Sequence, residues 1–144
     1  MGTPAAIAVQ TGKEVTWCHI NYDGYVEGAG RTLVEHYNTE ELAKSLIAGG
    51  DISVLHKSIE CPEGHSFMNP VKGFTIYYKR DRGETNVDPQ KGDYFHFLHC
   101  TKRTIKYLYK DGTWYWLRVK STPARFVDQW ELLPIGEVLS GLHD

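Results

Sequence analysis

The sequence lacks the features of exported and membrane-spanning proteins. It has only three cysteines, Cys18, Cys61 and Cys100, an odd number at irregular spacing that is unlike the disulfide framework of a small secreted domain. No apolar run approaches the roughly 18 residues that a membrane helix requires, and the first residues show no charged segment followed by a long apolar one. These absences predict an intracellular protein with no membrane contact.

An excess of basic charge is also missing. With 16 Lys+Arg against 18 Asp+Glu, the formal net charge is −2 at pH 7. Proteins that bind duplex nucleic acid gain much of their affinity by neutralising phosphates, so we expect no duplex partner. A chain of 144 residues that is 41% hydrophobic and 24% charged is typical of one globular domain, here residues 1–144.

Familiar catalytic motifs are absent. Gly28-Ala29-Gly30 lacks the third glycine of a dinucleotide-binding fingerprint, and no P-loop, Gly-x-Ser-x-Gly elbow or metalloprotease histidine pair occurs. The sequence therefore favours a non-enzymatic protein with no cofactor and no bound metal.

The first part of the chain predicts a hairpin followed by two short helices. Residues 5–9 and 15–20 are apolar or β-branched, and a three-residue loop between them would pair Val9 with Val15. Residues 31–37 predict the first helix. Asn38 followed by Glu41 resembles a capping box for the second helix, which ends at Gly49-Gly50. The apolar stripe of that helix is Leu42, Ala43, Leu46 and Ile47.

The rest of the chain predicts further strands. Residues 74–79 and 94–99 are strand-like and enclose a long charged loop. Asp111-Gly112 favours a two-residue turn between strands at 105–109 and 113–119, which pairs Tyr109 with Trp114. A short helix is expected at 135–142. Together these elements predict a single compact α+β domain, an antiparallel sheet of hairpins with two short helices after the first hairpin.

Residues 21–30 contain three glycines and predict an irregular loop that leads into a helix. N–H groups at such a helix start attract phosphate or carboxylate, and tyrosine rings can stack a base. The alternative is a turn with a structural role alone. The predicted ligand-binding residues of this region are Tyr22, Asp23, Tyr25, Gly28, Gly30 and Arg31.

Two arginines in the segment Arg80-Asp81-Arg82-Gly83-Glu84 are expected to approach the same site from the later loop. Arg80 and Arg82 would clamp a phosphate while Asp81 orients one guanidinium group. A solvated charged turn is the alternative. His19 and His36 are expected to have structural or ligand-orienting roles, because both flank the glycine-rich loop and can approach Asp23.

Other histidines and cysteines allow two further interpretations. Cys61 with His65, and His96 with His99 and Cys100, have spacings that zinc ligands show, although no Cys-x-x-Cys pair accompanies them. The alternative is buried cysteines and scattered polar histidines.

The segments His56-Lys57-Ser58 and His99-Cys100-Thr101 match the His-x-Ser/Thr element of two-histidine phosphodiesterases. Matches of this kind also arise by chance among seven histidines.

The order of the motifs resembles a family of small proteins common in bacteriophage genomes and prophage regions. The resemblance covers roughly residues 7–119 and departs from the family pattern at Asn21-Tyr22, where one aromatic residue is common. The motifs that carry it are His19 with Tyr22-Asp23-Gly24-Tyr25, Gly28, Gly30, His36-Tyr37, Leu46-Ile47, Gly50-Asp51-Ile52-Ser53, residues 80–84 and Asp111-Gly112-Thr113-Trp114-Tyr115.

The resemblance implies a phage protein without an established reaction that acts in the cytoplasm of the bacterial host. We expect an accessory protein that counters host defence by binding a small anionic, nucleotide-like ligand or a host protein, and a homo-oligomer is compatible with this role. The alternatives are a phosphodiesterase or other hydrolase that uses His56 and His99, and a structural or assembly accessory of the virion.

Overall fold

The computed structural model describes residues 2–100, 105–120 and 129–141. The strands are β1 Ala5–Thr11, β2 Glu14–Tyr22, β3 Ile52–Val54, β4 Ile76–Tyr77, β5 Gln90–Gly92, β6 Ile105–Lys110, β7 Thr113–Lys120 and β8 Gln129–Pro134. The helical segments are the π-helical turn η1 Val26–Gly30, α1 Arg31–His36, α2 Glu40–Ala48, α3 Tyr78–Arg82, α4 Tyr94–Cys100 and α5 Ile135–Gly141. None of the helices in these ranges is long and apolar enough to cross a membrane.

One mixed sheet organises the fold, with strand order β4-β3-β2-β1-β6-β7-β8 and with β5 paired to part of β2. The predicted α+β class is confirmed. The expected purely antiparallel pairing is corrected at two junctions, because β1 pairs with β6 and β2 pairs with β3 in parallel. Turn residues in the sequence predict pairing only between the two strands of one hairpin. Parallel strands are joined by long connections, and no short sequence motif indicates which strands will pair.

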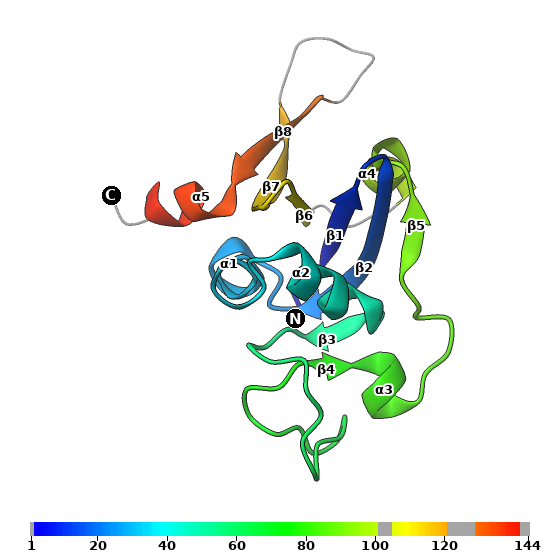
Figure 1. Ribbon diagram of the computed structural model, residues 1–144. Coiled ribbons are helices and arrows are strands. Elements are labelled where there is room, and N and C mark those ends of the chain that lie inside the picture. The colour runs from blue at the N-terminus through cyan, green and yellow to red at the C-terminus, as the bar shows by residue number, and fades with distance from the viewer. Residues whose placement is uncertain (1, 101–104, 121–128, 142–144) are drawn as a thin grey trace.

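The connection from β2 to β3 is a crossover through η1, α1 and α2. Figure 1 shows α1 and α2 next to each other, with α2 at the lower part of β2 and with β3 and β4 at the lower end of β2. Ile20 pairs with Ile52 and Tyr22 pairs with Val54. The carboxyl ends of two parallel strands therefore meet at one edge of the sheet.

Two hydrophobic clusters lie on opposite faces of the sheet, because successive strand side chains alternate. The cluster under α1, α2 and α5 includes Ile7, Cys18, Leu33, Leu46, Tyr107 and Trp114. The cluster on the other face includes Ala6, Trp17, Leu108 and Leu117, and α4 packs there through Phe97 and Leu98. The sheet is thus covered on both faces.

Both predicted hairpins are present. The second has the expected register, with Tyr109 opposite Trp114 and Tyr107 opposite Trp116. The register of the first hairpin differs by one residue, because its loop contains only Gly12 and Lys13 and Val9 faces Thr16. Gly12 has a φ of 62°, the conformation that favours glycine at the first position of a tight hairpin turn.

The predicted strand at 94–99 is wrong, because these residues form α4. The Asp93 carboxylate accepts the backbone N–H of His96 at 2.8 Å and so caps the helix start. Tyr94, Phe97 and Leu98 then share one helical face against the second cluster. Asp93, which can cap a helix, was the residue in the sequence that indicated this helix.

Other boundaries also change. The second helix is capped by Thr39, whose hydroxyl accepts the N–H of Leu42 at 3.1 Å, and not by Asn38. Of the strand predicted at 74–79 only β4 forms, and α3 begins within its span. The expected final helix forms as α5, and Leu142 lies outside the described residues.

Candidate functional site

A cavity of about 470 Å³ opens beyond the carboxyl end of β3, between α1 and the loop that precedes β4. In sheets with parallel strands this edge is the usual place for ligands, because the strands end there and the following segments diverge. We call it the cationic pocket, and its lining residues are Thr32, His36, Leu55, His56, Lys57, Lys72 and Gly73.

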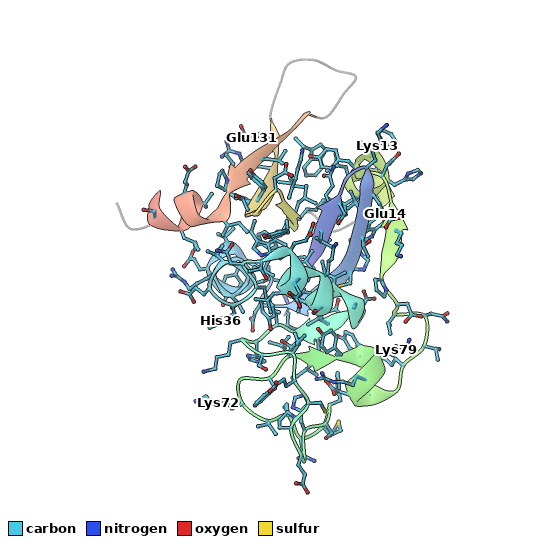
Figure 2. The ribbon with its side chains drawn as sticks, in the orientation of Figure 1. Lys13, Glu14, His36, Lys72, Lys79 and Glu131 are labelled. Atoms are coloured by element: carbon cyan, nitrogen blue, oxygen red, sulfur yellow. The ribbon has the colours of Figure 1, made fainter. Side chains whose placement is uncertain are left out.

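The lining of the cationic pocket carries charge of one sign. Lys57 and Lys72 bring two ammonium groups and His36 and His56 bring two imidazoles, whereas none of the described residues that line it is Asp or Glu. Figure 2 shows His36 and Lys72 on the same side of the molecule, far from Lys13 at the tip of the β1–β2 hairpin. An anion is therefore the ligand that this lining suits.

Hydrogen bonds fix the backbone at the base of the cationic pocket. The Tyr37 hydroxyl donates to the His56 carbonyl at 2.6 Å. The Thr75 hydroxyl accepts the His56 N–H and donates to the His56 carbonyl, both at 3.0 Å. The Ser58 N–H donates to the Gly73 carbonyl at 3.2 Å, which joins the two segments that carry the lysines. The position of His56 is thus set by tertiary contacts.

Burial lowers the pKa of His56 below the ordinary imidazole value. The nearby Asp23 carboxylate acts in the opposite direction and raises this pKa, and His65 lowers it further. Asp23 belongs to the segment where the sequence predicted a ligand site, so one predicted residue lies within electrostatic reach of the pocket. His36, the other predicted residue here, lines it directly.

The glycine-rich segment is more regular than expected. Residues 26–30 form η1, which runs directly into α1, so only residues 23–25 are irregular. The N–H groups of Gly28 and Gly30 donate to the Tyr25 carbonyl at 3.0 and 3.4 Å, and the Arg31 N–H is bonded within η1. The expectation of a loop with free N–H groups is corrected, since a helical turn uses them internally.

Close packing explains two of these glycines. A Cβ atom on Gly24 would lie 2.6 Å from the Thr3 carbonyl oxygen, and one on Gly28 would lie 2.7 Å from the Asp23 carbonyl oxygen.

Tyr22 and Tyr25 keep 47% and 46% of their surface exposed. Their rings are therefore available to a ligand, and binding by this segment stays a prediction.

Arg80 and Asp81 form the centre of a network within residues 59–81. The Asp81 side chain is only 1% exposed. Its carboxylate accepts hydrogen bonds from Arg80 Nε and from the Tyr77 backbone N–H, both at 2.8 Å. It also lies 3.3 Å from His65 Nε2. The Arg80 guanidinium also donates to the carbonyls of Ile59 and Thr75. Asp81 does orient one guanidinium, as expected, but that guanidinium holds backbone carbonyls.

Arg82 lies beside this network. Its guanidinium is 4.7 Å from the Phe67 ring centroid and 3.6 Å from the Glu84 carboxylate. Both arginines thus contact segments other than the glycine-rich one, and a shared phosphate clamp stays a prediction.

His19 makes its carboxylate contact with Asp51. His19 Nδ1 lies 3.4 Å from Asp51 Oδ1, and the His19 backbone N–H donates to the same oxygen at 2.9 Å. This contact links β2 to the residue before β3, and a structural or ligand-orienting role for His19 stays a prediction.

The residues considered for zinc divide between two places. Cys61 and His65 lie near Asp81, while His96 and His99 are in α4. Within residues 2–100, 105–120 and 129–141, no three His, Cys, Asp or Glu side chains form a group suited to a metal ion.

His56 lines a pocket with residues of α1, on the face of the sheet opposite to the one that α4, with His99, covers. Leu55, next to His56, belongs to the cluster under α1 and α2, whereas α4, which carries His99, packs on the other cluster. Figure 1 shows α4 at the opposite end of β2 from β3. Thr101 lies outside the described residues. This arrangement offers no support for a two-histidine phosphodiesterase.

Comparison with known proteins adds no assignment: no protein-family model, curated protein or solved structure matches this chain.

Sequence reasoning missed Lys57 and Lys72 as site residues. Neither belongs to a motif for anion binding, and they are separated by 14 residues whose path only the tertiary structure fixes. Their neighbour His56 was considered, but for a different chemistry.

Proposed function

We propose that this chain is a binding protein for a small anionic, nucleotide-type ligand, held in the cationic pocket. The observation that carries the proposal is the convergence of Lys57, Lys72, His36 and His56 on one cavity at the carboxyl edge of a parallel strand pair. A volume of about 470 Å³ lies in the range of small-molecule sites, roughly 300–1,000 Å³.

The neighbouring segment supports a nucleotide over a bare anion. Tyr22 pairs with Val54 at the end of β2, two residues before His56, and the Tyr25 ring lies against Gly28. The Gly28 carbonyl accepts the hydroxyl of Thr32, a pocket residue, at 3.1 Å. The two tyrosines of this segment are half-exposed, and such rings can stack a base, which a bare anion lacks.

The phage resemblance supports the biological setting of this proposal. An accessory protein that sequesters a nucleotide signal in the cytoplasm of an infected bacterium needs affinity and does not need turnover. The proposed role is therefore to lower the free concentration of a host signal.

Isothermal titration calorimetry of the full chain with linear and cyclic nucleotides tests the proposal. We expect at least one ligand to bind, to be recovered unchanged, and to lose roughly tenfold in affinity in Lys72→Gln, since one charge contact in a partly screened site is worth on the order of 1 kcal/mol. Lys13→Gln, at the far hairpin turn, is the matched control and should bind normally. No binding across the panel, or hydrolysis of the bound nucleotide, would overturn the proposal.

A further inference from the structure

The charges around the cationic pocket distinguish between kinds of phosphate. Two lysines are cationic at neutral pH, and two imidazoles add up to two further charges when protonated. Coulomb attraction grows with the charge of the ligand. A phosphomonoester is close to a dianion at pH 7, because its second pKa is about 6, whereas a phosphodiester, including a cyclic nucleotide, carries a single charge.

We propose that the cationic pocket holds the free terminal phosphate of a linear nucleotide, and that the His56 imidazole takes up a proton as this phosphate binds. The inference rests on the proposed function, since it names the ligand group and the regulation of that same pocket.

The surroundings of His56 make this proton uptake possible. The charged and titratable groups facing it are Asp23 from the end of β2, His65 from the following loop, and the pocket's own His36, Lys57 and Lys72. Among the effects on its pKa, burial is the largest and lowers it, so His56 in the free protein takes up a proton less readily than an ordinary imidazole. A bound dianion adds negative charge beside the ring and raises this pKa.

The direction of the pH effect follows from this linkage. A proton taken up on binding makes the affinity fall as the pH rises through the pKa of the bound state, by at most about tenfold per pH unit for one proton. Between about pH 7 and about pH 8.5 a phosphomonoester is already dianionic, so its own titration contributes little there.

Calorimetry of the full chain tests both parts. The probes are adenosine 5′-monophosphate, cyclic adenosine monophosphate, inorganic phosphate and sulfate, which remains a dianion throughout this range. We expect the linear nucleotide to bind about tenfold more tightly than the cyclic one, and the Kd for the linear nucleotide and for sulfate to rise roughly three- to tenfold from about pH 7 to about pH 8.5. Titrations in two buffers of different protonation enthalpy should show net proton uptake.

Two variants test whether His56 is the group that takes up the proton. His56→Gln should bind with an affinity that no longer depends on pH, while His96→Gln, an exposed histidine of α4, should behave as the unaltered chain. If His56→Gln does not fold, the two-buffer measurement on the unaltered chain decides the point. Binding without proton uptake, or equal affinity for the cyclic nucleotide, overturns this inference and leaves the proposed function standing. Failure of all probes and of the nucleotide panel overturns the proposed function itself.

Discussion

His19 and Asp51 hold the two parallel strands β2 and β3 together at the amino end of β3. One carboxylate oxygen of Asp51 accepts the His19 backbone N–H at 2.9 Å and lies 3.4 Å from His19 Nδ1. The Asp51 N–H donates to the Val87 carbonyl at 2.8 Å, and its carbonyl accepts the Tyr78 N–H at 3.2 Å. Asp51 thus joins three segments that are distant in sequence.

Replacing Asp51 with alanine should lower the free energy of unfolding by about 1–3 kcal/mol, since a part-buried backbone N–H loses its charged acceptor. Asp51→Asn keeps an acceptor oxygen and should lose less. Urea denaturation followed by circular dichroism measures both. Equal stability of Asp51→Ala and the unaltered chain would show that the contact between Asp51 and His19 does not stabilise the fold.

Asp81 should make the protein sensitive to acid. Burial alone would raise the pKa of this carboxyl, but the hydrogen bonds from Arg80 and the Tyr77 N–H outweigh it, and the pKa lies below its ordinary value. The folded state therefore binds this proton less readily than the unfolded chain, whose aspartates titrate near 3.9. The stabilisation is present above about pH 4 and is lost as the pH falls through the folded-state pKa.

We expect Asp81→Ala to cost about 3 kcal/mol at pH 7, because it leaves the guanidinium of Arg80 without its carboxylate. Asp81→Asn should also reduce the loss of stability between about pH 5 and about pH 3. Urea denaturation at several pH values gives both quantities. Asp88→Ala, which removes an exposed partner of Lys79, should change stability by less than about 1 kcal/mol and is the matched control.

Gly28 should not tolerate a side chain. A Cβ atom there would lie 2.7 Å from the Asp23 carbonyl oxygen and 3.0 Å from the Tyr25 ring. Gly28→Ala should therefore lower the melting temperature, by the several degrees that about 1–3 kcal/mol represents in a domain of this size. Gly136→Ala in α5, where no described residue apart from its chain neighbours and the helix backbone lies within 4 Å of the added Cβ, should instead stabilise by roughly 0.4–1 kcal/mol. A thermal shift in the same direction for both variants would contradict the packing argument.

Tyr25 should contribute to nucleotide binding and not to phosphate binding. Its half-exposed ring suits base stacking, which is worth about 1–3 kcal/mol per base. Tyr25→Ala should weaken nucleotide affinity by roughly tenfold or more and leave the affinity for sulfate unchanged. Phe95→Ala, which removes a 66% exposed ring on α4, controls for loss of an exposed aromatic residue. If both tyrosine and phenylalanine variants bind normally, the base lies elsewhere.

The local elements were largely predictable. Asp111-Gly112 fixed a hairpin and its register, and the stripe with Ala43, Leu46 and Ile47 gave α2. These signals act between residues a few positions apart. The strand predicted at 94–99 failed because alternating aromatic residues were given more weight than the Asp93 cap.

The candidate site was only partly predictable. His36 and Asp23 came from a segment that the sequence marked, and the structure puts one in the lining of the pocket and the other within reach of His56. Arg80 was expected to serve a ligand, yet its donors bind Asp81 and two backbone carbonyls. A short sequence motif does not reveal whether an arginine has partners within its own chain.

By itself the sequence determined the hairpins, the helix that follows Thr39 and the α+β class, because turns, caps and periodic apolar faces depend on neighbouring residues. Only the tertiary structure decided that β2 and β3 run parallel and that Lys57 and Lys72 face one cavity with His36 and His56. The pairing of distant strands depends on burial of the whole sheet. That pairing determines where the parallel strands end, and the segments that follow bring the four basic side chains together.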